Sequence, residues 1–90
     1  MFQSKNELLI QRLRNILIVK YQISHQNLRI LWEESDAFIS NFMKNNVKSL
    51  NTGKFFSLIT NAKLKGLTEL YEDLIKVVFE LINYEPPKNQ

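Results

Sequence analysis

The near absence of glycine and proline restricts the folds that this chain of 90 residues can adopt more than any other feature does. Gly53 and Gly66 are the two glycines, and both prolines, Pro86 and Pro87, stand close to the end. Short β-strands need a turn about every 8–12 residues, and such turns are rich in Gly and Pro. Apolar residues make up 44% of the chain, which suits a globular core. The sequence therefore favours long helices in a single domain covering residues 1–90.

Two amphipathic segments predict helices over residues 4–21 and 24–48. In the first, Leu9, Leu13 and Leu17 follow the helical period, and Ser4 offers a cap at the start. In the second, apolar residues recur at steps of three and four, which also indicates one buried helix face. These residues are Leu28, Leu31, Trp32, Phe38, Ile39, Phe42 and Met43.

Two further segments predict helices over residues 52–63 and 68–84, followed by a short tail over 85–90. Asn51 or Thr52 is placed to cap the third helix, and Gly66 marks the connection to the fourth. Thr68 is expected to cap the fourth helix, whose first turns are acidic. Four amphipathic helices joined by short links predict an all-α fold, an antiparallel four-helix bundle.

The residues that most enzymes and metal sites need are scarce. The chain has no Cys, and His25 is its single histidine, so we expect no metal site, no cofactor and no catalytic residue. His25 stands beside a predicted helix start, where a capping or surface role is expected. The longest apolar run, Ile16–Val19, is far shorter than the roughly 20 residues that span a bilayer. We therefore expect a cytoplasmic protein that is not an enzyme.

The net charge of +3 is unevenly distributed along the chain. Between residues 37 and 68 there are five lysines and no acid, which suits either contact with an anionic partner or simple solvation. Nucleic-acid binding is less favoured, because the cations are spread over several elements and the last helix is acidic.

The segment from Lys63 to Ile75, with the sequence KLKGLTELYEDLI, resembles the bacteriocin immunity proteins of Gram-positive bacteria, of the enterocin A immunity type. In that family a third helix leads into a short apolar and basic link, followed by a capped fourth helix with an acidic first turn. The chain length, the lack of Cys, the basic charge and the four-helix order also agree. The resemblance departs after Tyr84, where family members often carry a longer tail.

The resemblance implies a protein that protects a producer cell from its own class II bacteriocin. It would bind the sugar permease that serves as receptor, the bacteriocin peptide, or the complex of both, from the cytosolic side, with peripheral contact at the inner face of the membrane. The partner-binding residues implied on this chain are Lys54, Lys63, Lys65, Tyr71 and Tyr84.

A second hypothesis needs no resemblance. Four amphipathic helices without catalytic residues also suit a small helical adaptor or regulator that binds other proteins, as a monomer or a dimer. The neighbouring genes would separate the two, because a gene for a short bacteriocin precursor favours immunity.

Overall fold

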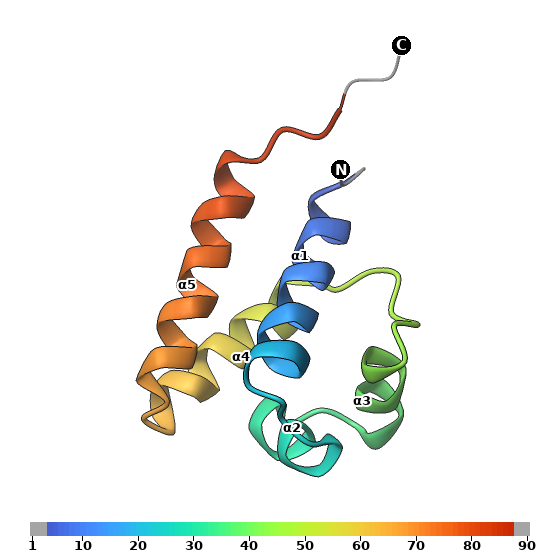
Figure 1. The fold of residues 1–90 in the computed structure, drawn as a ribbon, viewed down its shortest axis with the longest axis vertical. Helices are drawn as coiled ribbons and strands as arrows, with labels where there is room; N and C mark the ends of the chain where they lie inside the picture. The colour runs from blue at the N-terminus through green and yellow to red at the C-terminus, as the bar shows by residue number, and fades with distance from the viewer. Residues whose placement is uncertain (1–3, 88–90) are drawn as a thin grey trace.

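The computed structural model describes residues 4–87, and within them the chain is helical without any strand, which confirms the all-α class (Figure 1). The described residues form five α-helices and one π-helix, so the predicted four-helix bundle is not confirmed. The elements are α1 (Lys5–Arg14), the π-helix η1 (Asn15–Lys20), α2 (His25–Trp32), α3 (Asp36–Met43), α4 (Thr52–Leu64) and α5 (Thr68–Asn83).

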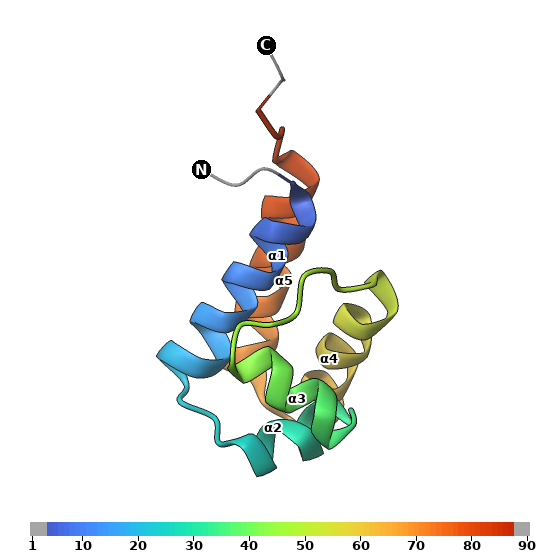
Figure 2. The same ribbon diagram turned by 90° about the vertical axis from the view of Figure 1, so that its right-hand side faces the viewer.

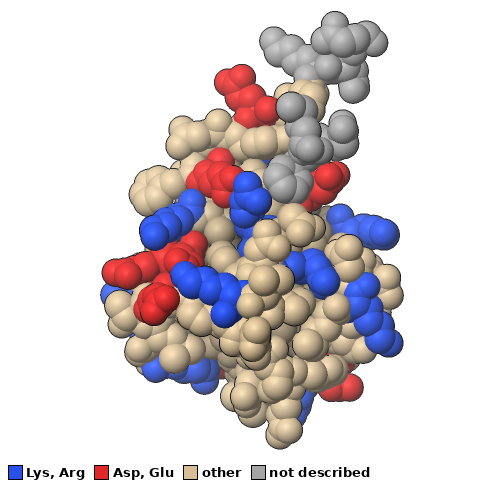
Figure 3. Space-filling model, viewed as in Figure 1, with Lys and Arg blue, Asp and Glu red and all other residues tan. Residues whose placement is uncertain are grey.

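The packed helices that lie farthest apart in the sequence are α1 and α5, which lie side by side and run in opposite directions (Figures 1 and 2). An ion pair spans this boundary, Arg12 to Glu80 at 2.8 Å, and Lys20 of η1 pairs with Asp73 of α5 at 2.7 Å. Acidic and basic side chains accordingly lie next to one another along it (Figure 3). α4 packs against α5 and α2, and α3 packs chiefly against α2.

The prediction of one helix over residues 24–48 is wrong, because α2 ends at Trp32 and a separate helix follows. Glu33 adopts the left-handed conformation, with φ 58° and ψ 42°, and ends α2. The hydroxyl of Ser35 then accepts a hydrogen bond from the Phe38 N–H at 3.1 Å and starts a new helix. α3 ends at Met43 rather than near residue 48.

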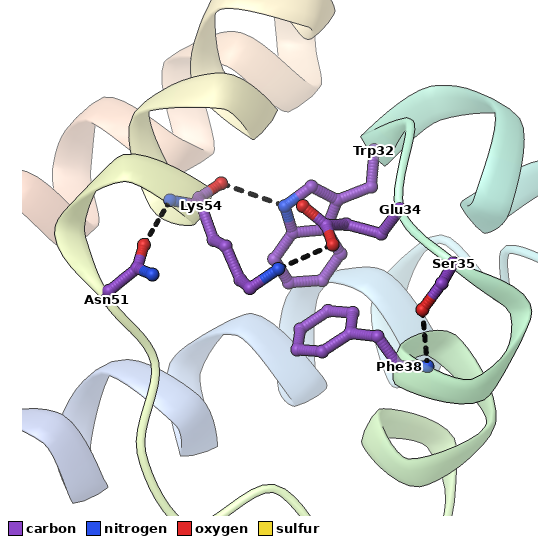
Figure 4. A network of polar contacts seen from close by, with 6 residues as sticks. All are labelled: Trp32, Glu34, Ser35, Phe38, Asn51 and Lys54. Carbon is purple, nitrogen blue, oxygen red and sulfur yellow. Dashed lines mark hydrogen bonds and ion pairs between the residues drawn. The ribbon is translucent and has the colours of Figure 1, made fainter.

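The ring of Trp32 explains the break. It makes edge-to-face contacts with Phe38 and Phe42, at centroid distances of 5.2 and 5.1 Å. In a continuous helix, a residue six positions on would lie roughly 9 Å along the axis and about 240° around it. The bend at Glu33 folds α3 back so that both rings reach the indole, whose nitrogen donates to the Lys54 carbonyl at 2.8 Å (Figure 4).

The helix predicted over residues 4–21 is helical from Lys5 to Lys20 but changes type at Asn15. From there to Lys20 the chain winds as a π-helix, and the Tyr21 N–H donates to the Ile16 carbonyl at 3.0 Å, five residues back. The wider turn keeps Leu17 fully buried, while Lys20 and Tyr21 both reach the neighbouring α5.

The last two predicted helices agree with α4 and α5 to within one residue at each end. The Asn51 side chain caps α4 by accepting from the Lys54 N–H at 2.8 Å. The predicted Thr68 cap is wrong, because the cap position of α5 is Leu67, which makes no side-chain hydrogen bond there. Of the predicted tail over 85–90, residues 88–90 lie outside the described residues.

Gly66 makes the tight turn between α4 and α5. Its φ of 73° is left-handed, and its N–H donates to the Lys63 carbonyl at 3.1 Å. The Leu67 N–H reaches back to the Ala62 carbonyl at 3.0 Å, so two carbonyls at the end of α4 are satisfied. A residue with a side chain would be strained at this φ, which is why the turn uses glycine.

The core is a single apolar cluster to which every helix contributes, and no polar residue among the described ones is buried. The fully buried side chains of largest volume are Trp32, Phe42, Leu8, Leu13, Leu17, Leu28, Ile39, Leu58 and Leu74.

Candidate partner-binding surface

The structure separates the five residues implied as partner-binding into three places. Lys63, Lys65 and Tyr71 gather around the turn between α4 and α5. Lys54 lies near the other end of α4, roughly 14 Å from Lys63 along the helix axis, given a rise of about 1.5 Å per residue. Tyr84 follows the end of α5 and is half-buried. The five residues therefore do not form one surface.

Lys54 is engaged inside the molecule. Its ammonium group lies 2.5 Å from a carboxylate oxygen of Glu34 and 4.6 Å from the centre of the Phe38 ring (Figure 4). Its backbone carbonyl accepts from the Trp32 indole. These contacts fasten the start of α4 to the α2–α3 connection, so we assign Lys54 a structural role.

The turn between the last two helices forms a basic and apolar projection, here called the α4–α5 tip and comprising residues 63–67 with Tyr71. Lys63 places its ammonium group 4.8 Å from the centre of the Tyr71 ring, a cation–π contact. Leu64 is 78% exposed and Leu67 is 42% exposed. Among residues 4–87 no carboxylate forms an ion pair with Lys63 or Lys65. The tip therefore presents positive charge beside solvent-exposed leucine side chains.

A groove of about 590 Å³ adjoins the tip, where the η1–α2 connection meets the start of α5. Apolar side chains form most of its wall, and the polar residues Gln22, Ser24, Asn27, Thr68 and Glu69 stand among them. A groove of this size and character suits an apolar side chain with a few polar contacts. The apolar lining residues are Tyr21, Ile23, Leu31, Leu67 and Leu70.

A charged network beside the groove holds η1 against α5. Asp73 accepts from the Tyr21 hydroxyl at 2.6 Å and from the Lys20 ammonium at 2.7 Å, and Lys20 also lies 3.6 Å from Glu69. Burial, followed by the hydrogen bond to Asp73, raises the pKa of Tyr21 to about 12. Although its burial acts in the opposite direction, the hydrogen bonds from Lys20 and Tyr21 lower the pKa of Asp73. The network therefore fixes one edge of the groove.

Sequence reasoning missed the groove because its two walls come from residues 21–31 and 67–70, which are far apart in the sequence. Leu31 follows the apolar spacing of the helix predicted over residues 24–48, which indicates a core position and gives no sign of a groove. A local signal was available for Leu67, an apolar residue directly after the glycine turn. His25 does not cap α2, because the hydroxyl of Ser24 accepts from the Asn27 N–H at 3.2 Å and fills that role. His25 is the first residue of α2, and its partly exposed side chain lies with Nε2 2.7 Å from Oδ1 of Asp36.

Two further observations concern metal binding and membrane insertion. Within the described part of the chain, no three Asp, Glu, His or Cys side chains come close enough together to hold a metal ion. No helix among residues 4–87 is both long and apolar enough to cross a membrane. The chain matches no family model, curated protein or solved structure.

Proposed function

We propose that the chain is a protein-binding module of the bacteriocin-immunity kind. Its α4–α5 tip and the adjoining groove would bind a receptor permease, the bacteriocin, or both, from the cytosolic side of the membrane. One observation carries this proposal: the turn that ends in Leu67, a residue of the groove wall, also carries a second exposed leucine and two lysines that form no ion pair among residues 4–87. The tip lies within the segment whose sequence resembles the immunity proteins.

The α4–α5 tip and the groove suit a partner whose surface is partly apolar and partly anionic. Burying an exposed leucine and filling the groove would supply affinity, since removing apolar surface from water is the dominant favourable term in most protein association. Lys63 and Lys65 would add selectivity for a partner with negative charge, because unpaired cations steer and orient association. The cation–π contact with Tyr71 already holds Lys63 in place, which reduces the entropy lost on binding.

A protection assay tests the proposal. The chain is expressed in a bacteriocin-sensitive Gram-positive strain, and growth is measured against a panel of class II bacteriocins. We expect a large rise in tolerance to one peptide, and its loss in the double variant Lys63→Glu/Lys65→Glu. The matched control is Lys44→Glu/Lys48→Glu, which changes the net charge equally at exposed lysines of the α3–α4 segment.

The control decides whether the tip itself matters. Protection that both double variants lose equally would point to overall charge and contradict a specific tip. A Leu67→Ser variant probes the groove, because Leu67 belongs to both the tip and the groove wall. Far-ultraviolet circular dichroism and thermal melts establish that each variant is folded.

The adaptor hypothesis uses the same surface for a different protein. The exposed Leu64 and Leu67 favour it as well, because they suit any partner with a partly apolar surface. Absence of protection across the panel, with folded and expressed protein, would reject the immunity proposal. Affinity capture of one host protein that Lys63→Glu/Lys65→Glu abolishes would then support the adaptor.

A further inference from the structure

The wall of the groove beside the tip carries little net charge. Among the residues that line it, Glu69 is the one with a charged side chain, and its carboxylate lies 3.6 Å from the Lys20 ammonium group. The other lining residues are apolar or carry neutral polar groups. Inside the groove, apolar contact and hydrogen bonds therefore select the occupant, and charge does not.

Two carboxamide side chains, those of Gln22 and Asn27, belong to this wall. Both residues are exposed, and among residues 4–87 neither side chain makes a hydrogen bond. The neighbouring hydroxyl of Ser24 is occupied, because it accepts from the Asn27 N–H at the start of α2. A carboxamide offers N–H donors and an oxygen acceptor, the groups that pair with the C=O and N–H of a peptide unit. The wall can therefore bind main chain at two points.

The size of the groove also indicates that main chain enters it. A volume of about 590 Å³ is larger than any single amino-acid side chain, so one anchoring side chain leaves space beside it. The carboxamides come from residues 21–31, whereas Leu67 and Leu70 form the wall on the α5 side. A peptide can thus place its main chain along the first wall and an apolar side chain against the second.

We propose that the groove binds an extended, uncharged peptide segment with one bulky apolar side chain. The main chain of the segment pairs with the carboxamides of Gln22 and Asn27, and its apolar side chain packs against Leu67 and Leu70. The segment is extended because the main-chain groups of a helix already bond to one another, whereas those of an extended segment are free. The inference rests on the proposed function, which assigns the groove to a protein partner, and names the part of that partner that enters it.

Nuclear magnetic resonance on the ¹⁵N-labelled full chain tests the groove directly. The probes are capped pentapeptides of the form Gly-Ser-X-Ser-Gly, in which X is Leu, Phe or Ser. With peptide up to about 10 mM, we expect saturable shifts at the amides of Ile23, Leu67 and Leu70 when X is Leu or Phe, since a ligand with few contacts binds with millimolar affinity. The peptide with Ser should bind at least tenfold more weakly, because it lacks the apolar side chain.

The double variant Gln22→Ala/Asn27→Ala tests the two carboxamides. We expect it to raise the dissociation constant of the Leu peptide at least tenfold, as the loss of two hydrogen bonds implies. Gln22 has a left-handed φ of 50°, and alanine keeps the Cβ, so the backbone strain stays the same and the change isolates the amide. The matched control is Gln26→Ala, which removes a carboxamide from an exposed residue of α2 outside the groove wall and should leave the dissociation constant unchanged.

Each outcome supports or overturns the proposal. The absence of saturable shifts with every peptide, or shifts confined to residues outside the groove, overturns it. Equal affinity for the Ser peptide overturns the apolar anchor, and a double variant no weaker than Gln26→Ala overturns the main-chain contacts. Thermal melts show that the variants remain folded. Peptide binding and protection in cells are separate measurements, so a chain that binds the Leu peptide but gives no protection rejects immunity and retains the peptide groove.

Discussion

The Tyr21 hydroxyl donates a hydrogen bond to Oδ2 of Asp73 at 2.6 Å, across a separation of 52 residues in sequence. The bond joins the end of η1 to α5 beside the groove. Because Asp73 also accepts from Lys20, a single carboxylate fixes two consecutive side chains of the π-helix end. The position of the groove wall therefore depends on this carboxylate.

The raised pKa of Tyr21 predicts a loss of stability in alkali. Its folded pKa of about 12 lies above the ordinary value of 10.0, so the neutral phenol is favoured by folding. The contribution is complete below pH 10 and is lost as the pH rises from about 10 to about 12. Chemical unfolding at several pH values should show this fall, and Tyr21→Phe should reduce it, leaving the part that comes from the raised pKa of Lys20. Phenolate absorbance should lose its highest-pH step in that variant, and an unchanged titration would contradict the assignment.

The Arg12–Glu80 pair predicts a loss of stability in acid. The hydrogen bond from Arg12 lowers the pKa of Glu80 below its ordinary value of 4.5. The contribution is therefore present above pH 4.5 and is lost as the pH falls through the folded pKa. We expect Glu80→Gln to reduce the free energy of unfolding by about 0.5–1 kcal/mol at pH 7, as partly exposed pairs do, and to have less effect at pH 2–3. Glu72→Gln is the control, and an equal effect from it would contradict the pairing.

The left-handed conformation of Glu33 predicts a stabilising substitution. A residue with a Cβ costs about 1–2 kcal/mol in this conformation, and glycine does not. We expect Glu33→Gly to raise the free energy of unfolding by about 0.5–1 kcal/mol relative to Glu33→Ala, measured in urea. Glu33→Ala shares the loss of the carboxylate, so the comparison isolates the backbone. Equal stability of the two variants would show that the turn relaxes in solution.

Burial predicts an order of stability losses among three apolar side chains. Leu74 is fully buried, Phe38 is half-buried and Phe79 is largely exposed. We expect Leu74→Ala to cost about 2–5 kcal/mol, Phe38→Ala less, and Phe79→Ala within about 0.5 kcal/mol of the wild type. Thermal and urea unfolding measure all three. The reverse order would contradict the core described above.

The two roles assigned to α4 lysines predict that the same substitution lowers stability at Lys54 and leaves it nearly unchanged at Lys63. Lys54→Glu places a carboxylate beside Glu34 and removes the contact with Phe38, so we expect a loss of about 1–3 kcal/mol. Lys63→Glu changes an exposed residue and should stay within about 0.5 kcal/mol of the wild type. Equilibrium unfolding compares them at equal net charge. Similar losses in both would remove the distinction between a structural and a surface lysine.

Local patterns predicted α4 and α5 well because their signals are independent of the rest of the molecule. Asn51 caps one helix, Gly66 ends it, and the apolar stripe of α5 follows the helical period. The break at Glu33 could not be read in this way, since the apolar spacing from Leu28 to Phe42 suits one long helix as well as two short ones. A weak signal was present in Ser35, a preferred cap residue followed by an acid.

The candidate surface was predicted only in part. Lys63, Lys65 and Tyr71 are brought together because they flank one tight turn, which local sequence specifies. Lys54 is grouped with them by the family resemblance, and its contact with Glu34 depends on the bend between α2 and α3. The groove depends on how η1 ends relative to α5, which no local pattern reports.

The π-helix also determines how the two ends of the first helical segment are rotated relative to each other. Removing one residue from Asn15–Lys20 would allow ordinary α-helical hydrogen bonds, and would turn the preceding residues by about 100° relative to those that follow. Arg12 and Lys20 could then no longer face Glu80 and Asp73 together. The extra residue thus sets the register between α1 and α5, so that in this segment the length of the chain, as much as its composition, specifies the fold.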